Sequence, residues 1–231
     1  MNKIVGIKAV SFDVDGTLWD FEEVMRRSLH YVLKELRKFD LTAAGMLDVE
    51  KMIEIRDKVA NELKGKVTNL EKVRLEAFRQ TLREVGRPNN ALASHLNQVF
   101  FKHRFEDAKL FDDVLSTLKA LRAKYTIGIV SNGTGYPHQS GLENIFQFLV
   151  FSQDCDIEKP DPRIFQIAMK KAECSSKQLL HVGDSLQDDV MGALKAGIRC
   201  VWLNRKQEKN NLNLKIDYEI SSLLKLLEIL E

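Results

Sequence analysis

The sequence of 231 residues has few of the features that would place a protein outside the cell or in a membrane. Its three cysteines are an odd number scattered over the last third of the chain, which is a poor basis for a disulfide framework. The apolar stretch before Asp13 is too short for a secretory signal, and no run of about 18 apolar residues occurs. We therefore expect a soluble cytoplasmic protein with no membrane partner.

The sequence also lacks a large excess of positive or negative charge. The 35 Lys and Arg residues nearly balance the 33 Asp and Glu residues, for a formal net charge of +2. This balance gives no electrostatic argument for a nucleic-acid partner. A hydrophobic content of 44% excludes a disordered chain, and the length allows one large domain or two modest ones.

Proline and glycine are sparse between residues 19 and 106, which hold one proline and three glycines. Apolar residues recur there at the spacing of one helix face and predict about four consecutive helices. Thr68 with Glu71 fits a capping box, and Gly86 followed by Pro88 fits a helix stop. The apolar positions are Phe21, Val24, Met25, Leu29, Val32, Leu33 and Leu36; Met52, Ile53, Ala60 and Leu63; Val73, Ala77, Phe78, Leu82 and Val85; and Leu92, Leu96, Val99 and Phe100.

The rest of the chain alternates strands with helices, which is typical of a parallel sheet in an α/β fold. The first strand has no neighbouring strand in the sequence, so the helical block is best explained as an insertion after it. Strands are predicted at residues 7–12, 125–132, 148–152, 179–184 and 199–204, helices at 112–124, 162–172, 187–196 and 220–230, and a surface loop at 206–215.

Polar clusters follow directly on these apolar strands. Because parallel strands end at the same edge of a sheet, we expect the clusters to meet there, with the loop of Lys159 close by. The clusters contain Asp13, Asp15 and Thr17; Ser131, Asn132 and Gly133; and Asp184, Asp188 and Asp189.

Several carboxylates in such a small space require a cation. Two like charges repel by about 1 kcal/mol in water and about 4 kcal/mol at an effective dielectric constant of 20. A ligand set of oxygens without clustered His or Cys favours Mg²⁺ over zinc. Lys159 adds a fixed positive charge, and Thr17, Ser131 and the N–H groups around Asn132 and Gly133 are donors suited to phosphate. The set suits a phosphate dianion beside a metal ion.

Such a site predicts phosphoryl transfer. Asp13 is the candidate nucleophile that attacks phosphorus. Asp15, kept partly protonated by its like-charged neighbours, is the candidate acid for the leaving alcohol and then the base for the attacking water.

Four motifs in this order resemble those of the haloacid dehalogenase superfamily of phosphohydrolases with a helical (C1-type) cap. They are Asp13-Val14-Asp15-Gly16-Thr17-Leu18, Ser131-Asn132-Gly133, Lys159-Pro160-Asp161-Pro162 and Gly183-Asp184-Ser185-Leu186-Gln187-Asp188-Asp189. The resemblance implies a Rossmann-like core domain of residues 1–18 and 107–231 and a helical cap domain of residues 19–106. It also implies an enzyme acting on a small phosphorylated substrate.

The resemblance also assigns roles residue by residue. It implies Asp13 as nucleophile, Asp15 as general acid and base, and Mg²⁺ on Asp13, the Asp15 carbonyl and Asp184. Asp189 matches the second acidic position of the last motif, and Asp188 is the alternative because it lies one residue away. Phosphate contacts are implied for Thr17, Ser131, Asn132 and Lys159.

The main prediction is therefore magnesium-dependent hydrolysis of a phosphoric monoester through an aspartyl-phosphate. A phosphomutase would use the same core residues. A 2-haloacid dehalogenase would use Asp13 on carbon, but it has no use for Asp15 as a leaving-group acid. A phosphate-binding regulator without catalysis is the alternative from a different class. The sequence carries no signal of an oligomeric state.

Other polar residues have a simpler structural explanation. His181, inside an apolar strand, is expected to be a buried histidine with its hydrogen bonds satisfied. Trp19 either lines the entrance to the site or packs the hinge. The residues expected at the surface are Lys64, Lys66, Arg74, His103, Arg104 and His138.

Overall fold

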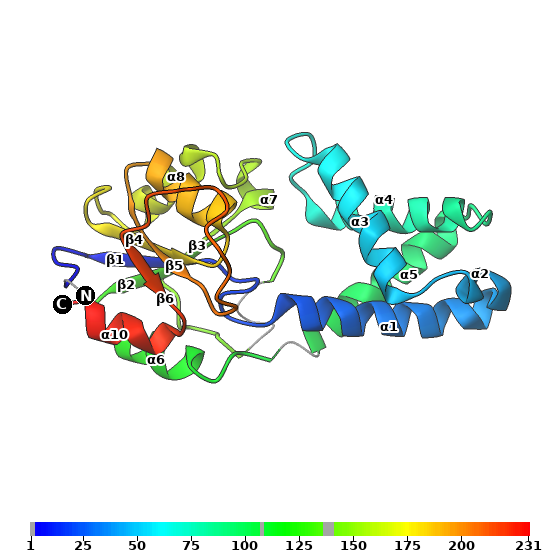
Figure 1. Ribbon diagram of the computed structural model, residues 1–231, viewed down its shortest axis with the longest axis horizontal. Coiled ribbons are helices and arrows are strands. Elements are labelled where there is room, and N and C mark those ends of the chain that lie inside the picture. The colour runs from blue at the N-terminus through cyan, green and yellow to red at the C-terminus, as the bar shows by residue number, and fades with distance from the viewer. Residues whose placement is uncertain (1–2, 107–108, 136–140) are drawn as a thin grey trace. The chain divides into compact units, whose positions relative to one another are not determined.

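The computed structural model describes residues 3–106, 109–135 and 141–231, and His138 lies outside this part of the chain. The chain divides into two compact units, which are drawn in Figure 1. The α/β unit consists of Met1–Asp20 and Lys109–Glu231, and the helical unit of Phe21–Ala108. The junctions thus fall two residues after the boundaries expected from the sequence.

The α/β unit is built on one parallel sheet. Its strand order is β3-β2-β1-β4-β5-β6, so β1 lies between β2 and β4. From β1 the chain builds the sheet outward in one direction through β2 and β3, and then in the other through β4, β5 and β6. Ligands bind at such a reversal in open α/β sheets. The strands are β1 Ala9–Phe12, β2 Thr126–Ser131, β3 Phe148–Phe151, β4 Leu179–Gly183, β5 Arg199–Leu203 and β6 Tyr218–Ile220.

The strand register brings the predicted polar clusters to one edge. Phe12, the last residue of β1, pairs with Ile129 of β2 and Val182 of β4. Asp13 continues this ladder, because its N–H donates to the carbonyl of Val182 at 2.9 Å. The parallel sheet and the position of these strand ends are confirmed.

Three predicted helices of the α/β unit are confirmed, whereas the short α7 at Ser152–Cys155 was not predicted and the end of the chain differs. Asp161 caps α8 by accepting the N–H of Arg163, and the helix expected from residue 187 begins as a π-helical turn. The single closing helix predicted for residues 220–230 is wrong, because β6 and two short helical turns share this segment. The helical elements are α6 Val114–Arg122, α7 Ser152–Cys155, α8 Pro162–Lys171, the π-turn Leu186–Val190, α9 Met191–Lys195, the 3₁₀ turn Leu223–Lys225 and α10 Leu226–Ile229.

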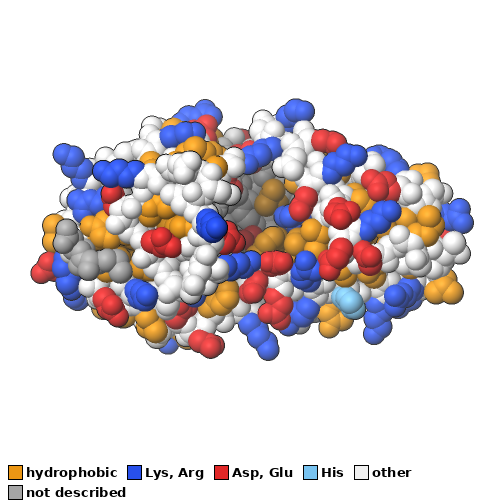
Figure 2. Space-filling model, in the orientation of Figure 1, with side chains coloured by type: hydrophobic (Ala, Val, Ile, Leu, Met, Phe, Trp, Pro, Cys, Tyr) orange, Lys and Arg blue, Asp and Glu red, His pale blue; other side chains and the backbone are white. Residues whose placement is uncertain are grey.

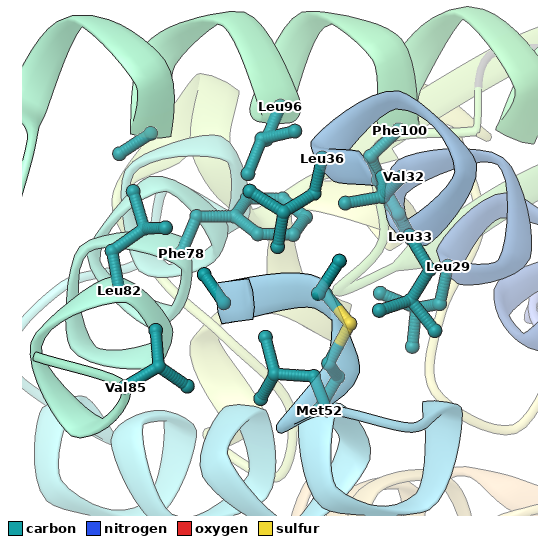
Figure 3. Packing of buried hydrophobic residues seen from close by; sticks show 14 of the residues in the cluster. Leu29, Val32, Leu33, Leu36, Met52, Phe78, Leu82, Val85, Leu96 and Phe100 are labelled. Atoms are coloured by element: carbon teal, nitrogen blue, oxygen red, sulfur yellow. The ribbon is translucent and has the colours of Figure 1, made fainter. Parts of the chain in front are cut away.

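The helical unit packs its apolar faces into one core, part of which is shown in Figure 3. Side chains of all five helices described in this unit contribute to it, including Leu36 of α1, Met52 of α3, Phe78 of α4 and Phe100 of α5. The fifth helix is the short α2, which the sequence analysis did not separate. The helices are α1 Phe21–Phe39, α2 Leu41–Gly45, α3 Val49–Leu63, α4 Leu70–Glu84 and α5 Asn90–Glu106.

Two details of these helices differ from the prediction. The capping box of Thr68 and Glu71 is wrong, because Asn69 is the N-cap of α4 and accepts the N–H of Lys72 at 3.0 Å. The buried face of α3 is also rotated from the expected one, since its fully buried residues are Met52, Ile55 and Val59. The predicted stop is confirmed, because α4 ends at Glu84 and Gly86 follows with a φ of +70°.

Two arginines of the helical unit are buried although a surface position was expected. Arg74 lies over the ring of Phe100, with its guanidinium carbon 4.1 Å from the ring centroid. Arg104 lies in the same way over Phe21 at 4.9 Å. The helical period predicted the apolar face, but it could not show that long cationic side chains would lie across aromatic rings inside it.

Each helix in the described part of the chain is too short or too polar to cross a lipid bilayer. The three cysteines, Cys155, Cys174 and Cys200, are free thiols.

Candidate active site

Four charged side chains from distant parts of the sequence meet at the carboxyl end of the sheet. Asp13 follows β1 directly, Asp184 follows β4, Asp189 lies in the π-helical turn, and Lys159 lies in the loop before α8. Asp13, Asp189 and Lys159 are buried, and the Asp184 side chain is partly buried. The topology thus creates a compact cluster of three carboxylates and one ammonium group.

Lys159 joins two of these carboxylates. Its Nζ donates to Oδ1 of Asp13 at 2.6 Å and to Oδ1 of Asp189 at 2.5 Å. Burial alone would lower the pKa of Lys159, but the two negative charges outweigh it and raise the pKa above its ordinary value. Lys159 is therefore a permanent positive charge in the cluster.

Asn132 holds the backbone of Lys159. Its Oδ1 accepts the Lys159 N–H at 2.7 Å, and its Nδ2 donates to the Lys159 carbonyl at 3.0 Å. The resemblance implied a phosphate contact for Asn132, whereas the structure places its carboxamide on the lysine loop. Ser131 is buried and accepts the N–H of Gly133 at 3.0 Å.

Asp184 packs against the turn that follows Asp13. Gly16 has a φ of +85°, and any Cβ there would collide with the carboxylate of Asp184, so both the conformation and the space require glycine. Thr17 donates to Oδ1 of Asp184 at 3.4 Å. Burial and the negative charge of Asp189 raise the pKa of Asp184 to about 7.

Asp189 is the more deeply buried member of the predicted acidic pair. Its Oδ1 accepts from both Lys159 and His181, and its Oδ2 accepts the N–H of Ser185 at 2.9 Å. Burial alone would raise the pKa of Asp189, but Lys159 and His181 hold it below its ordinary value. Asp188 bonds instead through its N–H to the Ser185 hydroxyl at 3.1 Å.

The donor set of this cluster fits a hard divalent cation. Asp13, Asp184 and Asp189 each offer an oxygen, and these atoms lie within 4.8 Å of one another. Among the described residues, Asp188 does not belong to this group. Burial raises the pKa of Asp13 well above its ordinary value even though Lys159 opposes this. The three carboxylates outnumber the single ammonium group of Lys159, and a set of oxygens of this kind suits Mg²⁺.

The Asp15 side chain makes contacts of its own. Its Oδ1 accepts the indole N–H of Trp19 at 2.8 Å, and its Oδ2 lies against Gly133, where a Cβ would meet it at 2.6 Å. The ring of Trp19 lies in the same way against Gly135. Sequence reasoning did not assign this contact to Trp19. The available signal was an aromatic N–H donor four residues after an acidic residue in a tight turn.

The loop that carries Thr17 is also held from outside the cluster. Arg205 donates to the Thr17 carbonyl at 3.1 Å and to both carboxylate oxygens of Asp113, at 2.8 and 2.9 Å. Asp113 also accepts from the Ser222 hydroxyl at 2.7 Å and the Leu223 N–H at 2.8 Å. Sequence reasoning missed this network, because neither Arg205 nor Asp113 belongs to a motif.

Comparison with known proteins places this geometry in a family context. A family model described as haloacid dehalogenase-like hydrolase matches residues 10–203. The chain is 26% identical over 239 residues to the glyceraldehyde 3-phosphate phosphatase of Methanothermobacter thermautotrophicus, a match that covers 96% of this chain and 100% of that enzyme.

Two further similar proteins have names that indicate another substrate or another reaction. The chain is 29% identical over 147 residues to the pyrimidine 5'-nucleotidase of Escherichia coli, a match that covers 61% of this chain and 65%, just under two thirds, of that enzyme. Among solved structures, a 2-haloacid dehalogenase from Pseudomonas syringae pv. Tomato DC3000 is similar with a TM-score of 0.80 and 30% identity. That similarity covers 96% of this chain and 97% of the dehalogenase.

Proposed function

The chain belongs to the haloacid dehalogenase-like hydrolases, and we propose that it is a phosphatase that hydrolyses the phosphate ester of a small metabolite with Mg²⁺ as cofactor. The observation that carries this proposal is the buried Asp13 carboxylate, which shares Lys159 with Asp189 at the end of the central strand. A nucleophile next to fixed positive charge suits attack on a dianionic phosphoryl group.

In the first step the phosphoryl group moves to the enzyme. An oxygen of Asp13 forms a bond to phosphorus while the bond from phosphorus to the ester oxygen breaks. Asp15 gives its proton to that leaving oxygen, so an alcohol departs and Asp13 carries the phosphoryl group. The indole N–H of Trp19 donates to Oδ1 of Asp15 at 2.8 Å and so orients this carboxyl group.

In the second step water restores the enzyme. Asp15, now a carboxylate, takes a proton from water as the water oxygen bonds to phosphorus and the bond from phosphorus to Asp13 breaks. Inorganic phosphate leaves, Asp13 is again a carboxylate, and Asp15 is again protonated. One residue thus acts as acid and then as base.

The remaining residues of the site bind and orient. Lys159 stabilises the negative charge of the phosphoryl oxygens, and Asn132 fixes the lysine loop by two hydrogen bonds to its backbone. Ser131, Gly133 and Thr17 are the proposed phosphate donors at the neighbouring strand ends, and a bound phosphate would take the Gly133 N–H from Ser131 and the Thr17 hydroxyl from Asp184. Mg²⁺, when bound, supplies a second positive charge beside the phosphoryl oxygens, and Asp13, Asp184 and Asp189 would hold it.

The substrate class is proposed from the relatives. The matches to a glyceraldehyde 3-phosphate phosphatase and a pyrimidine 5'-nucleotidase support small phosphorylated metabolites. Three free thiols suit the reducing cytoplasm, where such metabolites occur. A panel containing glyceraldehyde 3-phosphate, sugar phosphates, phosphoglycolate and pyrimidine nucleotides tests the class.

The proposal is tested with p-nitrophenyl phosphate in the presence and absence of Mg²⁺. We expect the wild-type protein to release phosphate only with the metal, and Asp13→Asn to lower kcat on the order of 10⁴- to 10⁶-fold, as loss of a catalytic nucleophile does. Equal activity of Asp13→Asn and wild type would overturn the assignment. Products formed in ¹⁸O-labelled water distinguish hydrolysis, which labels the phosphate, from a phosphomutase, which does not.

The similarity to a solved 2-haloacid dehalogenase favours one second candidate. In that reaction Asp13 would attack carbon and displace a halide, and no acid would be needed for the leaving group. The Asp15 carboxylate, held by Trp19, argues for the phosphatase instead. Halide release from 2-chloropropionate at a rate above that of phosphate release would favour the dehalogenase.

A further inference from the structure

His181 is a fully buried polar side chain that the proposed mechanism does not use. It lies on β4 and pairs in register with Ser11 of β1, two residues before Asp13. Its Nε2 lies 3.0 Å from Oδ1 of Asp189, and its Nδ1 lies 2.9 Å from the hydroxyl of Ser11. Both ring nitrogens therefore have a partner, as the sequence analysis expected of a core histidine.

The partners determine where the proton of His181 resides. The Asp189 carboxylate can only accept, so Nε2 must carry the hydrogen. Nδ1 faces the hydroxyl of Ser11, which also lies 3.4 Å from the Leu180 carbonyl, so this hydroxyl links the ring to the backbone of β4.

This N–H completes the set of donors around Asp189. Oδ1 receives His181 and Lys159, and Oδ2 receives the N–H of Ser185 at 2.9 Å. Without the imidazole, Lys159 and the Ser185 N–H would be the two remaining donors to this carboxylate. The ammonium group would then be drawn toward Asp189, away from Asp13 and the phosphate.

We propose that His181 is a positioning residue, which orients Asp189 and through it Lys159, and that Ser11 holds the imidazole in the orientation this requires. The hydrogen bonds run from Ser11 through His181 and Asp189 to Lys159, which also contacts Asp13. This inference rests on the proposed function, because the position of Lys159 affects catalysis only if Lys159 binds an anionic substrate.

Packing alone does not account for a histidine here. The ring of Phe165 contacts it edge-on, with centroids 4.9 Å apart, and an apolar side chain would fill the same space. A buried ring nitrogen without a partner costs about 1–3 kcal/mol, so a histidine is favoured only where both nitrogens are bonded. Here the Asp189 carboxylate that lies against Nε2 also accepts from Lys159.

The test compares two replacements of His181 with p-nitrophenyl phosphate and saturating Mg²⁺. His181→Phe keeps the ring but has no donor, whereas His181→Gln can place an N–H near the position of Nε2. Loss of a supporting hydrogen bond of this kind typically costs about 10- to 100-fold in activity. We expect this loss in kcat and a weaker inhibition by inorganic phosphate for His181→Phe, with His181→Gln recovering to within about fivefold of wild type.

Stability is measured beside activity so that a folding defect is recognised. Melting temperatures report whether each variant folds, and if His181→Phe does not fold, His181→Gln and Ser11→Ala decide. Ser11→Ala should lower kcat about 3- to 10-fold. Its matched control is Ser28→Ala, which removes a buried hydroxyl that donates to the Val24 carbonyl at 2.8 Å in the helical unit and should leave kcat unchanged.

Unchanged kcat in folded His181→Phe, or equal losses in the Phe and Gln variants, would overturn the proposal. A readout without substrate separates it from the proposed function. Nitrogen NMR of the imidazole should show the Nε2–H form in wild type and a mixture of forms in Ser11→Ala. A mixture already in wild type would refute the Nε2–H donor to Asp189, whereas wild type inactive on every phosphate ester would instead refute the proposed function.

Discussion

The two units differ in how they hold buried charge. In the α/β unit, Lys159 is bonded to carboxylates at the ends of strands that are far apart in sequence. In the helical unit, Arg74 and Arg104 lie over aromatic rings inside the packed helices. The ion pairs of Lys159 hold carboxylates together at the candidate site, whereas the ring contacts of Arg74 and Arg104 add to packing.

Exposed charge in the helical unit is different again. Figure 2 shows Lys and Arg side chains interspersed with Asp and Glu side chains over the visible face of these helices. Arg26 bonds to Glu50 at 2.7 Å and Arg83 to Glu76 at 2.9 Å, with every partner about one-third exposed or more. Such pairs contribute about 0–1 kcal/mol each, so they do not decide the fold.

After replacement of the nucleophile Asp13, the largest effect should come from replacement of Asp15, the proposed acid of the α/β unit. Asp15→Ala removes the group that protonates the leaving oxygen, and general acid–base catalysis is worth about 10²- to 10⁴-fold. We expect kcat to fall by this factor while KM changes little, measured by steady-state kinetics. The control is Asp112→Ala, an exposed aspartate of the same unit. Near-normal kcat for Asp15→Ala would remove Asp15 from the reaction.

Lys159→Met should show that charge in the α/β unit serves both chemistry and stability. Removing an electrostatic donor costs about 10²- to 10³-fold in kcat. Breaking a buried ion pair by removing one partner also costs about 3–5 kcal/mol in the free energy of unfolding, because Asp13 and Asp189 remain buried. Kinetics and chemical denaturation measure the two losses, with exposed Lys170→Met as control. A loss of kcat alone, or of stability alone, would contradict this double role of Lys159.

Arg74→Met tests the other side of the comparison. A desolvated contact between a cation and an aromatic ring is worth about 2 kcal/mol, so the free energy of unfolding should fall by about 1–2 kcal/mol. Arg37→Met, on the exposed face of α1, should change it by less than about 0.5 kcal/mol. Equal stability of the two variants under chemical denaturation would contradict the packing role of Arg74.

The smallest expected effect depends on pH. Burial alone would raise the pKa of Asp113, but hydrogen bonds from Arg205, Ser222 and Leu223 outweigh it and lower the pKa. Because the folded pKa lies below the unfolded value of about 3.9, the stabilisation is complete above that value and is lost as pH falls through the folded pKa. Asp113→Asn should therefore be less stable than wild type by about 1 kcal/mol at pH 7 and equal to it at strongly acidic pH. A difference that does not change with pH in urea denaturation would exclude the ionic cause, and exposed Asp217→Asn is the control.

Much of the α/β unit could be predicted from the sequence because strand direction fixes where strand ends meet. Asp13 and Asp184 follow apolar strands, and a parallel sheet leaves them no other edge. The choice between Asp188 and Asp189 could not be made from spacing. It depends on which side chain the π-helical turn directs toward Lys159, and the structure brings Asp189 there.

The features that were missed depend on single contacts rather than on periodic patterns. Asn132 follows a strand as a phosphate ligand would, yet both ends of its carboxamide bond to the backbone of Lys159. Strand β6 is three residues long and lies within an apolar pattern that also suits a helix. The network of Arg205 and Asp113 joins segments that no sequence motif links.

The central position of β1 in the sheet determines how late this strand becomes exposed when the domain unfolds. This strand is bonded on both sides, and the amide of Asp13 is itself bonded to Val182. Amides in such positions exchange with solvent deuterium only when the whole domain opens. The proposed nucleophile therefore directly follows a strand that stays hydrogen-bonded until the whole sheet unfolds.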